Sequence, residues 1–510
     1  MIPVTKAALP EPPPDKPDLL RVHPRDDVLV ALRDVQPGEM VRSATETFVA
    51  RSFVPRGHKL ASTAISSGAA VHKYGWPIGR ATQDIASGEH VHTHNLSTAL
   101  ATHEDYTYTP SAVAAPGGLA DTHTFLGYPR LNGRVGTRNE LWVLCTVGCV
   151  ARTARRIAEV AGERLKGRVD GVYALTHSFG CSQLGDDLMH TRRVLASLAA
   201  HPNAGGVLVV GLGCENNQLP ALLDVAKLDP SRVRSFNAQA VDDEVDEGVR
   251  ALEELAATLL QQDVRVPRPL SDLVVGVKCG GSDAFSGLTA NPLVGRISTL
   301  LAQAGGTPIL SEIPEIFGAE RMLMARAVDE AVFNDAAQLV NDFKQYFTAA
   351  GQRVSENPSP GNQAGGITTL EEKSLGAVQK AGDAPLTQVL RYGERIRRPG
   401  LALLESPGND AVSSTALAAA GATVLLFTTG RGTPLGFPAP TLKISSNSTL
   451  AHAKPRWIDF DAGTLLTGAS LDERAQALLD LVIATASGRP TCAERNGERE
   501  VAIWKTGVTL

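Results

Sequence analysis

The sequence predicts an α/β protein in which a small β-rich amino-terminal domain precedes two doubly wound, mostly parallel α/β regions. Three observations lead to this prediction. From residue 141 onward, short β-branched apolar runs alternate with longer helical stretches, which is typical of parallel strands joined by helices. Before residue 100 the apolar runs are short and are separated by Gly and Pro turns. Polar loops that contain cysteine follow several of the later strands, where open α/β sheets bind ligands.

The composition describes an enzyme-sized globular chain. Its 510 residues correspond to about three domains of ordinary size. A net charge of −5 is small for this length, so neither nucleic acid nor an anionic membrane is indicated as a partner. No apolar run approaches the ~20 residues of a membrane span. We therefore expect a small-molecule substrate, no nucleic-acid or membrane partner, and a homo-oligomer.

The amino terminus and the cysteines predict the compartment. Residues 1–16 are rich in proline and lack the apolar stretch of a secretory signal. Six cysteines are spread over the chain without the spacing of a disulfide framework. Both observations predict a cytoplasmic protein.

Shifts in composition divide the chain into five segments. We predict a Pro-rich tail (1–20), a β-rich domain (21–100), a linker (101–126), an α/β domain (127–268) and a carboxyl-terminal α/β domain (269–510). The linker assignment depends on its Thr, Ala and Pro content and on the lack of any apolar period.

Histidines gather in the β-rich domain. Its first clear strand is 28–32, and an apolar stretch followed by a Gly-Glu turn occurs twice, which indicates internal similarity. The segment HVHTHN (90–95) alternates histidines, and such residues project from one face of an extended chain. This spacing suits a metal or a surface that hydrogen-bonds a polyol. An exposed strand with surface histidines is the alternative.

A loop rich in arginine and glycine opens the second domain at 127–139. Arginine forks bind carboxylates in a bidentate manner, and glycine lets backbone N–H groups approach the ligand. The loop is therefore predicted to bind an anion, with a basic surface turn as the alternative.

The α/β alternation begins after this loop. Strands are expected at 141–146, 169–175 and 206–210, and helices at 151–161, 187–200 and 219–227. A charged helix at 242–260 and an extended segment at 266–270 close the domain. The carboxyl-terminal domain opens with a strand at 273–277, the turn CGGSD (279–283) and a helix capped by Asn291, and later strands are expected at 423–427 and 441–445.

Four cysteines fall at predicted strand-to-helix loops: Cys149, Cys181, Cys214 and Cys279. Parallel strands bring such loops to one edge of a sheet, and thiolates there would hold ferrous iron or an iron–sulfur cluster. Tight packing under a ligand is the alternative, since a free cysteine is usually a small buried hydrophobe. The histidines of the first domain are a competing metal site. Cys145 and Cys492 are expected to be structural.

Several motifs together resemble one known family. They are RVGTRN (134–139), HSFGC (177–181), GLGCE (211–215), CGGSD (279–283), SEIPE (311–315), NPSPGN (357–362), PGND (407–410) and TTGRGT (428–433). In this order they resemble the altronate/galactarate dehydratase family. The amino-terminal part, with HKYG (72–75) and HTHN (92–95), is similar to the SAF domain of that family.

The resemblance implies dehydration of a sugar acid, with D-altronate the first expectation, to a 2-keto-3-deoxy acid. Divalent iron is the implied cofactor, with manganese or an iron–sulfur cluster as alternatives. The residues implied in catalysis are His92, His94, Lys73, Asp283 and Glu312. Those implied in substrate binding are Arg134, Arg138, Asn139, His177 and Ser282. The expected metal ligands are the four cysteines inferred above from their position at the strand ends, Cys149, Cys181, Cys214 and Cys279.

Three other functions remain open at this stage. Galactarate is an alternative substrate. A related lyase, which expels sulfite from sulfolactate, uses comparable chemistry because it also removes a group β to a carboxylate. A non-catalytic sugar-acid-binding protein is the alternative from another class.

Overall fold

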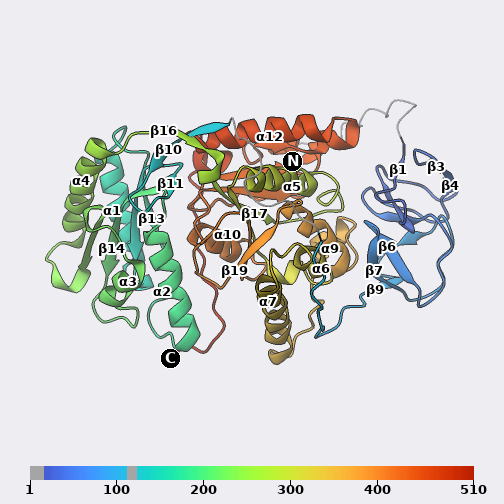
Figure 1. Ribbon diagram of the computed structural model, residues 1–510, viewed down its shortest axis with the longest axis horizontal. Helices are drawn as coiled ribbons and strands as arrows, with labels where there is room; N and C mark the ends of the chain where they lie inside the picture. The colour runs from blue at the N-terminus through green and yellow to red at the C-terminus, as the bar shows by residue number, and fades with distance from the viewer. Residues whose placement is uncertain (1–16, 112–122) are drawn as a thin grey trace, which may run out of the picture. The chain divides into compact units, whose positions relative to one another are not determined.

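The computed structural model describes residues 17–111 and 123–510, which form two compact units (Figure 1). Unit 1 comprises Met1–Ala99 and Pro358–Glu372, and unit 2 comprises Leu100–Asn357 and Lys373–Leu510. Residues 1–16 of the predicted tail and residues 112–122 of the predicted linker lie outside the described residues. Within the described ranges, no helix is both long and apolar enough to cross a bilayer.

Unit 1 is built from short antiparallel strands, as the sequence predicts. Buried aliphatic side chains such as Leu29, Val41 and Leu60 form its core. One sheet has the order β1-β2-β5-β8, another has the order β6-β7-β9, and β3 and β4 form a hairpin. The strands are β1 (Leu19–Leu20), β2 (Val28–Ala31), β3 (Met40–Arg42), β4 (Thr47–Val49), β5 (Lys59–Ala61), β6 (Ala70–Lys73), β7 (Trp76–Ala81), β8 (His90–Val91) and β9 (Leu96–Ser97).

A segment distant in sequence completes unit 1. Pro358–Glu372 contains α8 (Pro360–Ala364) and the beginning of α9 (Leu370–Ala377). Thr369 Oγ1 donates to the Ile78 carbonyl at 2.5 Å, and the Ala99 N–H donates to the Glu371 carboxylate at 2.7 Å. The division predicted from the sequence placed this segment in 269–510, because nothing in its composition distinguishes it from its neighbours.

The first sheet of unit 2 is parallel, with the order β13-β12-β14-β15. Along β12, Trp142 and Leu144 pack with α2 and α3, whereas Val143 and Cys145 pack with α1 and α4, so helices cover both faces (Figure 1). The elements are β12 (Glu140–Cys145), α1 (Ala151–Arg164), β13 (Val172–Leu175), α2 (Gly185–Ala199), β14 (Ala204–Gly211), α3 (Leu219–Ala226), β15 (Val233–Asn237) and α4 (Glu244–Gln262). A small antiparallel sheet beside it joins β10 (Thr124–Pro129), β11 (Val135–Gly136) and β16 (Val266–Pro269).

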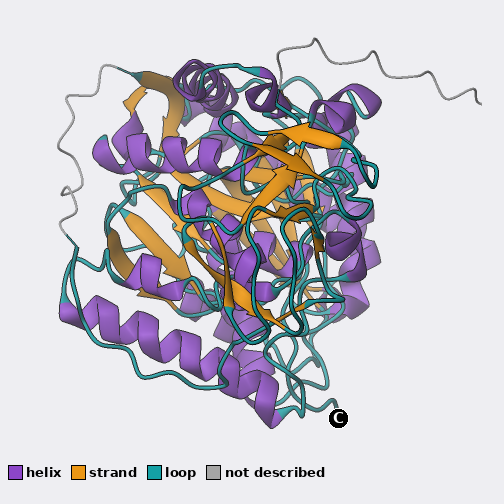
Figure 2. Cartoon of the chain, turned by 90° about the vertical axis from the view of Figure 1, so that its right-hand side faces the viewer, coloured by secondary structure: helices purple, strands orange, loops and turns teal. Residues whose placement is uncertain are grey.

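The second sheet of unit 2 is parallel and has the order β19-β20-β18-β17-β21-β22-β23. Figure 2 shows helices packed around these strands. The strands are β17 (Val274–Cys279), β18 (Thr307–Leu310), β19 (Leu386–Leu390), β20 (Leu401–Leu404), β21 (Val424–Thr429), β22 (Thr441–Ser445) and β23 (Phe460–Asp461). The helices are α5 (Ala290–Gln303), α6 (Glu320–Met324), α7 (Glu330–Ala349), α10 (Asp410–Ala419), α11 (Ser448–Ala453), α12 (Leu471–Ala486) and α13 (Cys492–Arg495).

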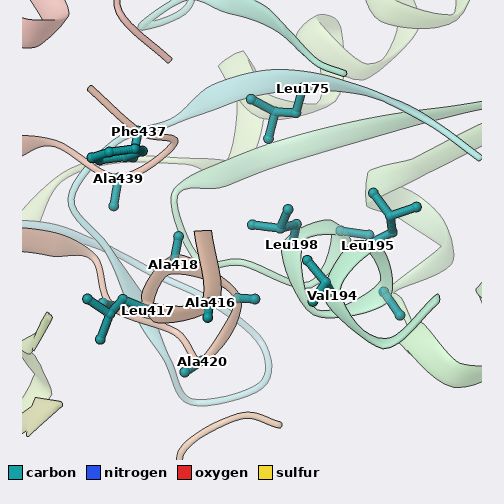
Figure 3. Close-up of a cluster of buried hydrophobic side chains, with 14 of the residues drawn as sticks. Leu175, Val194, Leu195, Leu198, Ala416, Leu417, Ala418, Ala420, Phe437 and Ala439 are labelled. Atoms are coloured by element: carbon teal, nitrogen blue, oxygen red, sulfur yellow. The ribbon is translucent and has the colours of Figure 1, made fainter. Parts of the chain in front are cut away.

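The two α/β regions of unit 2 share one hydrophobic core. Leu195 and Leu198 of α2 lie near Ala416 and Ala420 at α10, and Phe437 belongs to the same cluster (Figure 3). The doubly wound, mostly parallel fold class is therefore confirmed.

Two local predictions differ from the structure. Helix α5 begins at Ala290, and Asn291 is not its cap, because its amide donates to the Gly376 carbonyl and accepts from Thr428. The described part of the predicted linker is bound to unit 2, since Tyr106 donates to Glu320 and the Ser111 N–H donates to the Ala325 carbonyl.

Candidate active site

Three histidines meet in unit 1. His58 directly precedes β5, His90 begins β8, and His92 follows that strand. His58 Nδ1 lies 3.0 Å from His90 Nε2, and one ligand atom of each ring lies within 4.8 Å of the others. His92 Nδ1 is 2.8 Å from Thr368 Oγ1, which belongs to the inserted segment. His94 is exposed, and its ring centroid lies 5.3 Å from that of His90.

The three rings are kept neutral. The pKa of His90 is lowered to about 3, mainly by burial and to a lesser extent by the neighbouring His58. The pKa of His92 is lowered to about 4, mainly by burial and to a lesser extent by Lys59. Burial also lowers the pKa of His58. Metals bind the neutral imidazole, so this set of donors fits a divalent metal such as iron, manganese or zinc.

Two buried lysines share one carboxylate beside the histidines. Lys59 Nζ donates to Glu372 at 2.8 Å, to Thr368 Oγ1 at 2.7 Å and to the Gly366 carbonyl at 2.9 Å. Lys73 Nζ donates to the other oxygen of Glu372 at 2.8 Å. Burial would raise the pKa of Glu372, but Lys59 and Lys73 lower it to about 2.

The two lysines differ in how easily they lose a proton. Burial lowers the pKa of Lys59 to about 8, against an ordinary value of 10.5. Burial acts on Lys73 too, yet Glu372 and Tyr74 raise its pKa above the ordinary value. Lys73, which the resemblance implied as an acid or base, is therefore a permanent cation, whereas Lys59 is the readier proton acceptor.

A second buried cluster lies at the carboxyl end of β17 in unit 2. Cys279 Sγ lies 3.5 Å from the Glu315 carboxylate and 2.7 Å from Lys380 Nζ. Glu312 accepts from Lys278, Lys380 and the Cys279 N–H. Three lysines in all neutralise three carboxylates here: Lys278, Lys373 and Lys380 against Glu312, Glu315 and Asp410.

This cluster is a firmly charged scaffold. Burial would lower the pKa of Lys278, but Glu312 and Asp410 raise it. Burial and Glu312 raise the pKa of the Cys279 thiol to about 12, so the thiol keeps its proton at neutral pH. Cys279, Glu312 and Glu315 are close enough to ligate a metal, but Lys380 already faces the sulfur. This arrangement favours the histidines as the metal site.

Glu312 has an unusual backbone. Its φ of 70° lies in the left-handed region, which costs a non-glycine residue energy and is found most often at functional sites. The Glu312 N–H donates to Ser406 Oγ, and this contact holds the turn in place. The strain supports a functional role for Glu312, as the resemblance implied.

Asp283 is held by its own loops. Its carboxylate accepts from Ser286, from Ser446 Oγ at 2.7 Å and from Asn447 Nδ2 at 3.1 Å. A Cβ at Gly430 would lie 2.3 Å from the Asp283 carboxyl carbon, so only glycine allows this approach. Ser282 is buried next to it. Their predicted roles stay predictions.

The arginine loop is bound mainly to the protein itself. Arg138 forms a bidentate ion pair with Glu494 at 2.8 and 3.0 Å, and Asn139 accepts from Arg130. Arg134 Nη2 donates to the Ile396 carbonyl, and His177 Nε2 lies 2.9 Å from the Cys145 carbonyl. Nε and both Nη nitrogens of Arg138 donate to protein groups, so this guanidinium serves the structure. The binding roles expected of Arg134, Asn139 and His177 stay predictions.

The four loop cysteines do not form one group. Cys149, Cys181 and Cys214 are exposed and follow strands of the first parallel sheet, whereas Cys279 is buried in the second sheet. Among the described residues, none of the close groups of potential ligands contains the first three. The four cysteines do not form a single mononuclear site, because the strands that precede them belong to two different sheets.

Sequence reasoning named the histidines of the first domain only as a competing metal site, on the alternation that includes His90. His58 and Lys59 carry a weak signal, since they lie between a Gly turn and a strand. Glu315 ends a motif that indicated only the family resemblance. Three further residues were missed, because a buried lysine or glutamate in a helix resembles a surface residue: Glu372, Lys373 and Lys380.

Comparison with known proteins identifies the family. Residues 17–99 match "Altronate/galactarate dehydratase SAF domain", 127–259 match "D-galactarate dehydratase/Altronate hydrolase, second domain", and 270–509 match "D-galactarate/Altronate dehydratase, C-terminal". The chain belongs to the altronate/galactarate dehydratase family. The resemblance of its motifs to this family is thereby confirmed.

Individual members of the dehydratase family are similar along nearly the whole chain. Altronate dehydratase of Escherichia coli (strain K12) is 50% identical, covering 96% of this chain and 99% of the relative. Altronate dehydratase of Bacillus subtilis (strain 168) is 48% identical, with the same coverage. Galactarate dehydratase (L-threo-forming) of E. coli is 34% identical, covering 92% of this chain and 93% of the relative.

Proposed function

We propose that this chain is a hydro-lyase that dehydrates D-altronate to a 2-keto-3-deoxy sugar acid. The observation that carries the proposal is the identity of 50% and 48% to two altronate dehydratases, against 34% to galactarate dehydratase, at similar coverage. Galactarate is the second candidate substrate, because it belongs to a relative that also matches nearly the whole chain.

We infer that His58, His90 and His92 hold divalent iron, with manganese as the alternative. Their neutral rings and the mutual distance of their nitrogens support this assignment. A divalent ion supplies Lewis-acid chemistry, which polarises substrate oxygens next to the C2 proton.

Lys59 is the candidate base for the C2 proton. Its amino group is buried and shares Thr368 with His92, so the base and the proposed ligand set are supported by one side chain. A buried lysine with a lowered pKa is suited to proton abstraction near neutral pH. Lys73 keeps its charge and with Glu372 fixes the position of Lys59.

The reaction balances without any oxidant or reductant. The base removes the proton at C2, the electron pair of the C–H bond forms the C2–C3 double bond, and the C3–O bond breaks. The departing hydroxyl takes up a proton and leaves as water, and the enol tautomerises to the 2-keto acid. His94, exposed beside His90, is the candidate donor of the proton to the leaving hydroxyl.

The test is an anaerobic assay of the full-length protein. Ferrous ion is added or withheld, D-altronate, galactarate and sulfolactate are compared, and formation of the 2-keto-3-deoxy acid is followed. Iron-dependent product from D-altronate supports the proposal, and a His58→Ala variant is expected to lose the ion held by the histidines and, with it, turnover. Turnover of galactarate or sulfolactate alone would overturn the substrate assignment. Binding without product from any of them would point to a sugar-acid-binding protein.

We also expect a cytoplasmic location and a homo-oligomer. All six cysteines are unpaired, as they would be in a reducing compartment. Cell fractionation tests the first expectation, and light scattering after size-exclusion chromatography tests the second.

A further inference from the structure

We propose that Cys149, Cys181 and Cys214 bind an iron–sulfur cluster at the carboxyl edge of the four-stranded sheet in unit 2. This site is distinct from the three histidines of unit 1.

The topology brings the three cysteines to one edge. Strand β12 lies between β13 and β14, and all three run parallel. Cys149 follows β12, Cys181 follows β13, and Cys214 follows β14, each in the loop at the carboxyl end of its strand. Neighbouring parallel strands end side by side, so the thiols come from adjacent loops.

Hydrogen bonds tie these loops together directly beside the cysteines. The Gly148 N–H donates to the Phe179 carbonyl at 2.8 Å, which links the first loop to the second. The Asn217 N–H donates to the Gly180 carbonyl at 2.9 Å, and the Ser182 N–H donates to Asn216 Oδ1 at 2.8 Å. Both residues that flank Cys181 are therefore bound to the loop that carries Cys214.

The backbone around Cys181 and Cys214 is constrained. Ser182 has a φ of 57°, an unfavourable value for a residue with a side chain. A Cβ at Gly180 would lie 2.1 Å from the Thr146 carbonyl oxygen, so the loop packs directly on the end of β12. Strain of this kind is retained where a loop must hold a particular shape.

The three thiols are exposed, whereas the remaining cysteines are buried. Cys145, Cys279 and Cys492 lie in the interior, as free cysteines usually do. Three exposed thiols at one sheet edge are therefore unusual. Cys214 Sγ has an amide neighbour, since Gln239 Nε2 lies 3.6 Å away, and cluster sulfurs commonly accept such hydrogen bonds.

A cluster explains the spacing better than a single ion. A mononuclear site needs ligand atoms that almost touch, and among the described residues the three thiols are not in any group whose ligand atoms all lie within 4.8 Å. In a four-iron cluster each cysteine binds a different iron, so the thiols stand farther apart. Three protein ligands would leave one iron of a four-iron cluster without a cysteine.

The test is anaerobic reconstitution of the full-length protein with ferrous ion and sulfide. We expect acid-labile sulfide, iron in excess of that sulfide because the three histidines bind a further ion, visible charge-transfer absorption and an electron paramagnetic resonance signal after reduction. Cys149→Ser, Cys181→Ser and Cys214→Ser are each expected to lose the sulfide and the absorption. Cys492→Ser, a buried cysteine outside the site, is the matched control and should keep both. Circular dichroism and a cooperative melting transition establish that each variant is folded.

The outcomes separate this proposal from the proposed function. Iron without sulfide, or a triple Cys→Ser variant that still assembles a cluster, would overturn the cluster. His58→Ala is expected to assemble the cluster normally, because its effect is confined to unit 1. A protein that assembles the cluster but turns over no sugar acid would overturn the proposed function and leave the cluster site supported.

Discussion

Units 1 and 2 each bury lysines against glutamates, but in different proportions. In unit 1 two lysines share the single carboxylate of Glu372, whereas in unit 2 three lysines face three carboxylates. In unit 1 burial lowers the pKa of Lys59, whereas Glu372 and Tyr74 raise the pKa of Lys73. In unit 2 the neighbouring acidic groups raise the pKa of both Lys278 and Lys380. The difference shows that one carboxylate for each lysine keeps these buried amines charged, whereas a carboxylate shared by two lysines leaves one of them able to lose its proton.

The largest expected effect tests the role of Lys59. Lys59→Arg keeps the positive charge but cannot act as a base at neutral pH, so we expect kcat to fall by about 10²- to 10⁴-fold. Lys59→Met should lose as much activity. Steady-state assays with D-altronate measure kcat, and thermal melting of both variants checks the fold. An active Lys59→Arg variant would contradict the assignment of this lysine as the base.

The next effect concerns the charged scaffold of unit 2. Glu312→Gln removes the charge that pairs with Lys278 and Lys380, and loss of one partner of a buried ion pair costs about 3 kcal/mol. Urea unfolding measures the free energy. Glu473→Gln, at an exposed position of α12, is the matched control and should stay within ~0.5 kcal/mol. Equal stability of the two variants would show that the scaffold contributes no net stability.

Glu372 of unit 1 and Glu312 of unit 2 are expected to change the stability of the protein in opposite directions when the pH falls. The pKa of Glu372 is lowered to about 2 from an ordinary value of 4.5, so its contribution to stability is complete above pH 4.5 and is lost as the pH falls toward 2. Burial raises the pKa of Glu312 even though Lys278 acts to lower it. Glu312 therefore binds a proton more tightly in the folded state than in the unfolded state, so its protonation on acidification favours the folded state.

A pair of Gln variants checks these signs. Glu372→Gln should flatten the loss of stability below pH 4.5 by up to ~1.4 kcal/mol per pH unit, whereas Glu312→Gln should steepen it. Hydrogen exchange followed by mass spectrometry reports each unit separately. If the free energy of unfolding fell with pH at the same slope in both variants, the two carboxylates would not differ in their response to acid.

The smallest expected effect concerns thiol reactivity. Without metal, Cys149, Cys181 and Cys214 should react rapidly with iodoacetamide because they are exposed, and Cys279 should react slowly because it is buried with a pKa of about 12. Mass spectrometry of the timed reaction counts the adducts. After reconstitution with iron and sulfide, the three rapid sites should be protected. Rapid labelling of Cys279 would show that the scaffold opens readily.

Local patterns predicted the elements well where one property dominates. The strand at 441–445 coincides with β22, and the helix at 219–227 ends one residue beyond α3, because apolar runs and turn residues mark their own limits. Asn291 shows where such reasoning fails, since a residue typical of a helix cap is used instead for contacts with Gly376 and Thr428. Likewise, Arg138 was predicted to bind a substrate carboxylate, but its guanidinium forms an ion pair with Glu494 of the same chain.

By itself, the sequence determined the fold class, the family and the loops that carry histidine and cysteine, because these follow from local periodicity and from motifs in a fixed order. Only the tertiary structure decided which of those residues meet. The segment Pro358–Glu372 brings Glu372 to Lys59 and Lys73 across about three hundred residues, and no local pattern records such a contact. The tertiary structure also separated Cys279 from the other three loop cysteines. Cys279 ends a strand of the second sheet, and long-range packing decides which strands share a sheet.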